Sequence, residues 1–303
     1  MSTPNFFQGK SVVITGAASG IGEALSYAFA QQGARLLLAD KDADRLTKLA
    51  ESLRSQGVVC ITQVCDVALA YSVQNLAETA EMKLGGTDIL INNAGVALID
   101  TVEHLSLEDA QWLMGINFWG VVYGCKFFAP HMRMRSGSVI VNLSSIFAML
   151  SLPTQSIYNA SKAAVRAFSD SLRIELGAGS KRAHGLYPVG VLCVHPGGIR
   201  TRLVDQARMG DISSMAHTSQ ALKLQFSQIA RTSAERAAEE ILNAIVDRRK
   251  RILIGTDAKF GDLLYRLFPT HASDWFFRMG QLLRQRFGQR EIGKSVGQSD
   301  KDK

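Results

Sequence analysis

The sequence has few cysteines and no long apolar run. Four cysteines, Cys60, Cys65, Cys125 and Cys193, are scattered along 303 residues without the spacing of a metal site. Because most lie in or near apolar segments, we expect buried free thiols, a reducing intracellular setting and no metal. No apolar run approaches the roughly 20 residues of a spanning helix, and residues 1–9 lack the features of a signal peptide. These absences predict a cytoplasmic protein.

The sequence also lacks internal repeats, low-complexity segments and any recognisable nucleic-acid module. Its net charge is +7, but the basic residues are not clustered as such a module requires and are weighted toward the C-terminal part. We therefore expect no nucleic-acid partner. The hydrophobic content of 47% is enough for one α/β domain with a large core.

Strand-like and helical segments alternate along the chain, which predicts a parallel sheet with helices on both faces. We expect a single doubly wound, Rossmann-type sheet of seven strands in a domain spanning residues 1–255. A helical extension would occupy residues 256–303. The predicted strands are 11–15, 35–39, 58–64, 88–92, 138–143, 189–195 and 251–254.

A glycine-rich turn follows the first predicted strand and precedes a helix. Gly16 would let the chain turn sharply, Gly20 would let the backbone approach a pyrophosphate, and Gly22 would allow close packing of the helix on the strand. The pyrophosphate would rest on the free N–H groups of the helix N-terminus. The spacing is GxxxGxG and not the commoner GxGxxG, so a turn without a ligand is the alternative.

Asp40 ends the second predicted strand, 20 residues after Gly20. A carboxylate at this place can accept hydrogen bonds from the adenosine ribose and would repel a 2′-phosphate, which favours NAD over NADP. Lys41 could partly offset that repulsion. Alternatively, Asp40 is only the N-cap of the helix that starts near Asp42.

Tyr158 and Lys162 are four residues apart, so on a helix they share a face. An ammonium beside a phenol favours the phenolate, and with a cationic cofactor ring it could bring the pKa of the tyrosine toward neutrality. Such a tyrosine serves as general base for an alcohol or general acid for a ketone. A solvated pair with no catalytic role is the simpler alternative.

Together these segments resemble the short-chain dehydrogenase/reductase family over about residues 10–201, and more loosely to about residue 255. Besides Tyr158 and Lys162, the matching segments are the turn Thr15–Gly22 with Ser19 and Ile21, the pair Asp66–Val67, the run Asn92–Asn93–Ala94–Gly95, the residue Asn117, the strand end Asn142–Ser145, and Pro196–Gly197 with Thr201.

The resemblance implies a role for each matched residue. Ser145 would hold the substrate oxygen, Tyr158 would exchange a proton with it, and Lys162 would lower the tyrosine pKa and bind the nicotinamide ribose. Asn117 would anchor a water in a proton relay. The other matched positions would bind the cofactor: Gly16, Ser19, Gly20, Ile21, Gly22, Asp40, Asp66, Val67, Asn93, Ala94, Gly95, Pro196, Gly197 and Thr201. A homodimer or homotetramer is implied by the resemblance alone.

The residues after about 255 form an extension that short members of the family lack. We expect one helix from Asp257 to Phe268, a break at Pro269, and a second helix capped by Ser273 or Asp274 that runs to about Phe287. The second helix is amphipathic and basic. It could pack on its own domain or on a second subunit, lie on a membrane through residues 273–287, or wall a lipophilic substrate site.

The segment after the sixth predicted strand, about residues 202–232, is rich in apolar side chains and poor in carboxylates. It contains Leu203, Val204, Met209, Met215, Leu222, Leu224 and Phe226. Such a lining favours a hydrophobic alcohol or ketone, although these residues could simply be core.

We therefore predict an NAD-dependent oxidoreductase for a hydrophobic secondary alcohol and its ketone. An NADPH-dependent 3-oxoacyl-thioester reductase and a catalytically silent NAD-binding module are the alternatives.

Overall fold

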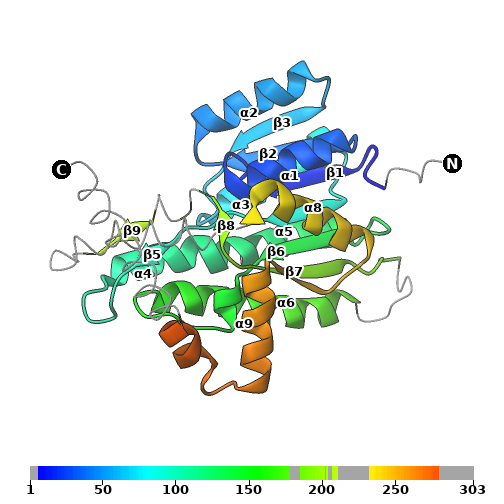
Figure 1. The fold of residues 1–303 in the computed structure, drawn as a ribbon. Coiled ribbons are helices and arrows are strands. Elements are labelled where there is room, and N and C mark those ends of the chain that lie inside the picture. Colours follow the sequence, from blue (N-terminus) through cyan, green and yellow to red (C-terminus); the bar gives the residue numbers. More distant parts are fainter. Residues whose placement is uncertain (1–5, 178–184, 202, 204–206, 211–231, 280–303) are drawn as a thin grey trace, which may run out of the picture.

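The computed structural model describes residues 6–177, 185–201, 203, 207–210 and 232–279. A seven-stranded parallel sheet in the order β11-β7-β6-β4-β1-β2-β3 forms its centre (Figure 1). The strands are β1 (Ser11–Thr15), β2 (Arg35–Asp40), β3 (Cys60–Val64), β4 (Ile89–Asn92), β6 (Val139–Leu143), β7 (Gly190–Pro196) and β11 (Arg251–Ile254). The predicted sheet is confirmed, and β3 departs furthest from its predicted bounds, starting two residues late.

The chain runs outward from the middle of the sheet in two directions. From β1 it builds β2 and β3 on one side, then crosses to β4, β6, β7 and β11 on the other. Connections that leave the carboxyl ends of β1 and β4 therefore diverge, and a crevice opens between them. In open α/β sheets ligands bind at such a switch point.

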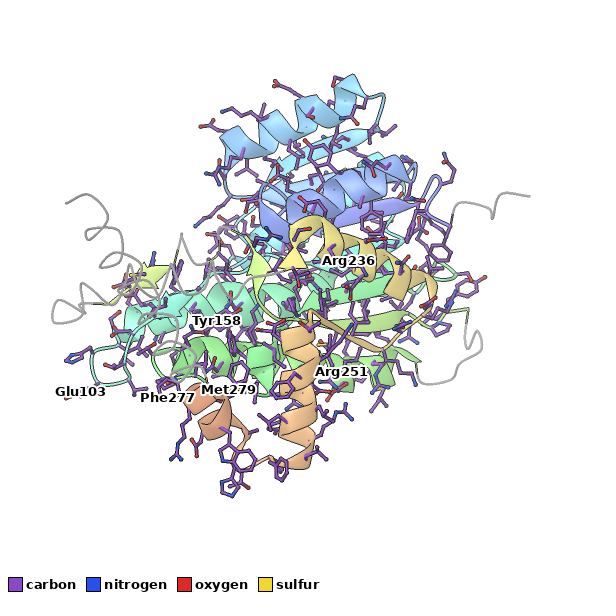
Figure 2. All side chains as sticks on the ribbon, in the orientation of Figure 1. Glu103, Tyr158, Arg236, Arg251, Phe277 and Met279 are labelled. Atoms are coloured by element: carbon purple, nitrogen blue, oxygen red, sulfur yellow. The ribbon has the colours of Figure 1, made fainter. Side chains whose placement is uncertain are left out.

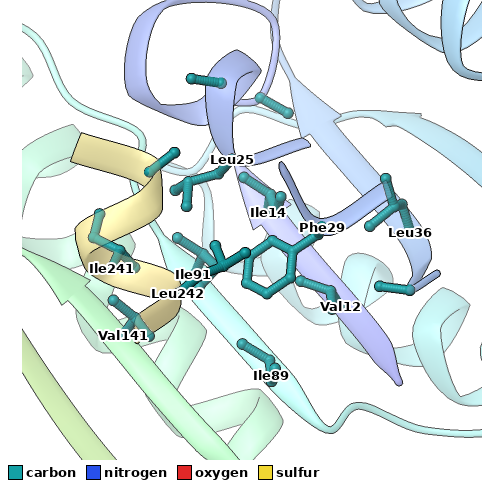
Figure 3. Packing of buried hydrophobic residues seen from close by; sticks show 14 of the residues in the cluster. Val12, Ile14, Leu25, Phe29, Leu36, Ile89, Ile91, Val141, Ile241 and Leu242 are labelled. Carbon is teal, nitrogen blue, oxygen red and sulfur yellow. The ribbon is translucent and has the colours of Figure 1, made fainter. Parts of the chain in front are cut away.

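Helices cover both faces because successive strand residues point to opposite sides. Val12 and Ile14 pack with α1 (Gly20–Gln31), α2 (Ala43–Ser55) and α8 (Ala234–Val246). Val13 packs on the other face with α3 (Ala70–Leu84), α5 (Gly120–Met132) and α6 (Ser156–Gly177). Figure 3 shows the ring of Phe29, which is fully buried, among side chains of the first of these layers.

Two short parallel ladders lie outside the main sheet. β5 (Leu98–Ile99) pairs with β9 (Arg208–Met209), and β8 (Ile199–Arg200) pairs with β10 (Thr232–Ser233). The Arg208 guanidinium lies 3.7 Å from the ring centroid of Trp112 and 2.6 Å from the Asp109 carboxylate. Trp112 and Asp109 belong to α4 (Leu107–Met114), so β9 is anchored to that helix. Residues Val204, Met215, Leu222, Leu224 and Phe226 lie outside the described part of the chain.

The C-terminal extension begins with α9 (Thr256–Leu267), which agrees with the predicted helix to within one residue. The next helix begins at residue 272, so the prediction that Ser273 or Asp274 caps it is wrong. Ala272 is fully buried and its N–H already bonds to the carbonyl of Phe268, while the Ser273 hydroxyl accepts a hydrogen bond from the Ser151 N–H. The remainder of that predicted helix lies beyond residue 279, where the description ends.

The packed face of this helix also differs from the apolar face that the sequence predicts, which contains Trp275 and Met279. Ala272 and Phe276 pack against the segment after β6, whereas Trp275 and Met279 are 43% and 38% exposed. Within the described ranges, no helix is long and apolar enough to cross a membrane.

Candidate active site

A cleft opens at the carboxyl ends of β1 and β4, and the glycine turn forms one of its walls. Gly16 adopts a φ of +63°, in the left-handed region that side chains rarely occupy. A Cβ at Gly22 would collide with the Gly16 carbonyl, so this position admits only glycine. Ser19 occupies the N-cap of α1 but makes no side-chain capping bond, which leaves the N–H groups of the first helical turn facing the cleft open to an anionic group.

Asn93 holds the turn against the end of β4. Its side-chain amide donates to the carbonyls of Thr15 and Gly16 at 3.0 and 2.9 Å, and its N–H donates to the Thr15 hydroxyl. Ala94 approaches so closely that a Cβ at Gly16 would lie 2.7 Å from its Cα. The predicted residues after β4 thus fix the geometry of the glycine turn as well as lining the cleft.

Asp40 faces the cleft at the end of β2. One carboxylate oxygen accepts from the Ala18 N–H and the other from the Asp42 N–H, both at 3.0 Å. The N-cap of α2 is Asp42, whose carboxylate accepts from the Arg45 N–H. Asp40 is therefore not the helix cap. Each of its oxygens keeps a second lone pair with which it can accept a ribose hydroxyl.

Ser145, Tyr158 and Lys162 meet at the other end of the same cleft, and all three are at most 8% exposed. Ser145 follows β6, and its hydroxyl oxygen accepts from the Phe147 N–H at 3.1 Å, which leaves the hydroxyl proton to donate. In the chain without substrate this hydroxyl bonds with Tyr158. Lys162 Nζ lies 5.8 Å from the Tyr158 ring centroid and donates to the Leu143 carbonyl at 3.0 Å. The Ser144 hydroxyl instead donates to the Lys162 carbonyl.

Burial controls the ionisation of these side chains in the chain without a nucleotide. It raises the pKa of Tyr158 to about 12, and hydrogen bonding with Ser145 offsets only part of the rise. Burial also lowers the pKa of Lys162 to about 8. In the chain without nucleotide the pKa of Tyr158 is thus raised, because desolvation of the phenolate outweighs the hydrogen bond with Ser145. The expected lowering, which also requires the cationic cofactor ring, stays a prediction.

Asn117 lies in a π-helical segment, Gly115–Trp119, between α4 and α5. Such segments interrupt α-helices frequently at functional sites. The side chain of Asn117 is fully buried and is held by Val96, accepting from its N–H and donating to its carbonyl. A Cβ at Gly95 would lie 3.3 Å from Asn117 Oδ1 and 3.4 Å from Lys162 Nζ, so these two groups approach each other across Gly95.

The structure brings nearly all of the predicted site residues to this one cleft. Those that line it include Ile21, Asp66, Val67, Gly95 and Thr201. Gly22 and Asn117 do not line it and act beneath its surface. The cleft is also lined by residues that the sequence did not mark as site residues: Gln155, Ile99, Val96, Ala97, Ile116 and Cys65. Of these, only Gln155 could have been found from the sequence, because it lies three residues before Tyr158.

The comparison with known families decides the identity of this arrangement. Residues 10–211 match the model of the short chain dehydrogenase family. The chain belongs to this family. Its members are oxidoreductases that act on CH–OH groups.

Curated relatives span most of the chain. SadH of Mycobacterium tuberculosis, named as an oxidoreductase, is 36% identical over 261 residues, which cover 86% of this short-chain dehydrogenase and 91% of SadH. The 11-beta-hydroxysteroid dehydrogenase A of Sesamum indicum is 32% identical and covers 95% of this chain and 80% of its own length.

Solved structures share the fold. A short chain dehydrogenase/reductase from Burkholderia phymatum in complex with NAD has a TM-score of 0.72 and 32% identity, covering 82% of this chain and 89% of its own. An alcohol dehydrogenase from Thermococcus sibiricus complexed with 5-hydroxy-NADP has a TM-score of 0.66 and 25% identity, covering 81% of this chain and 95% of its own. Similar enzymes therefore bind either nicotinamide dinucleotide.

Proposed function

We propose that this enzyme interconverts a hydrophobic secondary alcohol and its ketone, with NAD as the preferred cofactor. The observation that carries the proposal is the convergence of Ser145, Tyr158 and Lys162 at one end of a cleft whose other end holds Asp40. Asp40 supports NAD because its carboxylate faces the cleft where a 2′-phosphate would meet it. Lys41 also lines the cleft, and it is the feature that favours NADP.

The residues present fit a nicotinamide dinucleotide. The glycine turn and the open first turn of α1 would hold the pyrophosphate, Asp40 the adenosine ribose, and Lys162 the nicotinamide ribose. When bound, the nicotinamide ring supplies the hydride chemistry. The Ser145 hydroxyl would donate to the substrate oxygen and Tyr158 would exchange the proton with it. Asn117 and Lys162 would carry that proton onward.

The lining of the cleft near Tyr158 supports an apolar substrate. Ile99, Phe147, Ile199 and Leu203 line the same cleft as Tyr158, Phe147 packs beside Tyr158, and Gln155 adds a neutral amide. The names of several relatives, such as the Sesamum indicum 11-beta-hydroxysteroid dehydrogenase, support a steroid-sized substrate. A 3-oxoacyl-thioester reductase that uses NADPH remains the second candidate, and Lys41 is the residue that favours it. The predicted cytoplasmic location and homo-oligomer remain predictions.

The test is NADH or NADPH formation across secondary alcohols graded from short to steroid-sized. We expect turnover with NAD that rises with the apolar size of the substrate. Tyr158→Phe should lower turnover by about 100-fold or more, the usual contribution of a general acid or base, while NAD binding persists. Tyr71→Phe, which removes a hydroxyl from an exposed side chain on α3, is the matched control.

Two outcomes would replace the proposal. Preference for NADPH with acyl-thioester substrates would favour the reductase. NAD binding without turnover on any substrate would favour a catalytically silent NAD-binding module.

A further inference from the structure

One stretch of the cleft wall connects the catalytic serine to the glycine turn. Pro196, the last residue of β7, and Gly197, Ile199 and Thr201 after it all line the cleft. At one end, the ring of His195 contacts the Ser145 carbonyl at 3.1 Å. At the other end, a Cβ at Gly20 would lie 3.1 Å from the Thr201 side chain. The stretch thus borders the half of the cleft between the pyrophosphate turn and Tyr158.

The backbone of this stretch is held from behind by the start of the C-terminal extension. The Gly197 N–H donates to the Ile254 carbonyl at 2.9 Å, and the Gly198 N–H donates to the Asp257 carboxylate at 2.6 Å. A Cβ at Gly197 would collide with that carboxylate. Hydrogen bonds to a charged acceptor are short and strong, so Asp257 fixes the direction of this peptide.

Asp257 itself is placed by a helix that cannot shift easily. It lies in the first turn of α9, where the helix dipole favours a carboxylate. Ala258, the next residue, and Gly261, one turn further on, pack against the segment after Ser145, and a Cβ at Gly261 would lie 2.7 Å from a Leu150 methyl group. Asp262 pairs with Arg251 and Arg266. Figure 2 shows Arg251 beside α9, the orange helix that follows β11.

We propose that Asp257 is a positioning residue for the nicotinamide half of the dinucleotide, an inference that rests on the proposed function. It acts through the Gly198 N–H: with the carboxylate present, residues 196–199 present their backbone to the cleft in one fixed orientation. Without it, the peptide can rotate, and the contacts that this stretch makes with the nicotinamide end weaken. The adenosine end, built from Asp40 and the glycine turn, does not depend on Asp257.

The experiment compares two ligands that differ only at the nicotinamide end. Calorimetry on the full chain measures Kd for NAD and for ADP-ribose, which keeps the adenosine and pyrophosphate but has no nicotinamide ring. If NADP binds more tightly, NADP and 2′-phospho-ADP-ribose replace them. The variants are Asp257→Ala, Asp257→Asn, which keeps one acceptor oxygen for the Gly198 N–H, and Asp274→Ala, an equal loss of charge in the first turn of the exposed neighbouring helix.

We expect Asp257→Ala to weaken NAD about tenfold, the factor that corresponds to about 1.4 kcal/mol, and to leave ADP-ribose within about twofold. Asp257→Asn should restore most of the lost affinity, and Asp274→Ala should change neither ligand. Equal weakening of both ligands would overturn the inference, because it would show general damage to the fold. No change in either would overturn it as well.

The same measurements separate this inference from the proposed function. If the unmutated chain binds NAD but turns over no substrate, the proposed function is wrong. The ratio of the affinities for NAD and ADP-ribose in the Asp257 variants still tests the role of Asp257. A parent chain that binds neither dinucleotide overturns both.

Discussion

The ionisation of Tyr158 offers a direct test of how the site prepares its general base. Burial raises the pKa of this phenol from 10.0 to about 12. Catalysis near neutral pH therefore has to lower it by roughly five units, or about 7 kcal/mol. A unit charge at the 5.8 Å that separates Lys162 from the ring contributes about 3 kcal/mol at an effective dielectric constant of about 20, which is roughly two units.

Lys162 alone is thus insufficient, and its own charge is lost as pH rises through about 8. We predict that Tyr158 stays protonated up to a pH of about 12 in the chain without nucleotide, because Lys162 has lost its charge before the phenol ionises. Saturating NAD, whose oxidised ring is cationic, should bring its ionisation toward neutrality. NADH, whose ring is uncharged, should not.

The assay is ultraviolet difference absorbance of the phenolate, titrated with and without each nucleotide. Tyr158→Phe gives the background from the other tyrosines, and subtraction leaves the single phenol of interest. Identical titrations of the two proteins with NAD would refute the idea that the cofactor completes the base. A Tyr158 already ionised near neutral pH without nucleotide would refute the argument from burial.

Three further predictions follow from other residues. Asp40→Ala should reduce the NAD-over-NADP ratio in kcat/KM by about tenfold, since it removes both the ribose acceptor and the repulsion, and an unchanged ratio would assign selectivity elsewhere. Burial lowers the pKa of His195 to about 4, so the folded chain binds fewer protons than the unfolded chain between about pH 6.5 and 4. As the pH is lowered through that window, the free energy of unfolding should therefore fall by up to about 3 kcal/mol. Urea titrations at several pH values should show that the stability of His195→Asn depends less on pH. Deletion of residues 270–303, which removes the exposed Trp275 and Met279, should reduce flotation with anionic vesicles if the extension lies on a membrane, and equal flotation would exclude that contact.

The fold could be predicted because its signals are local. Each strand of the main sheet is a short apolar run, and β1 supplies buried side chains to both faces from adjacent positions, Val12 and Val13. The glycine turn and the Tyr158–Lys162 spacing likewise combine residues that are close in sequence. For these reasons Asp40 and the glycine turn could be placed in advance, whereas Ser145 was placed by the resemblance to the family.

The features that could not be predicted depend on contacts between distant segments. The role of Asp257 depends on Gly198, 59 residues earlier. The start of the last described helix is set by the burial of Ala272, which no local pattern reveals. The raised pKa of Tyr158 depends on how completely the surrounding elements exclude water from it.

The position of β11 and α9 at the end of the chain has a consequence for biosynthesis. The pairing of β1 with β2 and β4, and of β2 with β3, completes the Asp40 end of the cleft from the first 92 residues. The support behind Gly197 and Gly198 comes from Ile254 and Asp257, which leave the ribosome more than 160 residues later. At about 5–20 residues per second, that interval lasts on the order of ten seconds or more. The half of the cleft that recognises adenosine can therefore form on the ribosome well before the half that performs the chemistry.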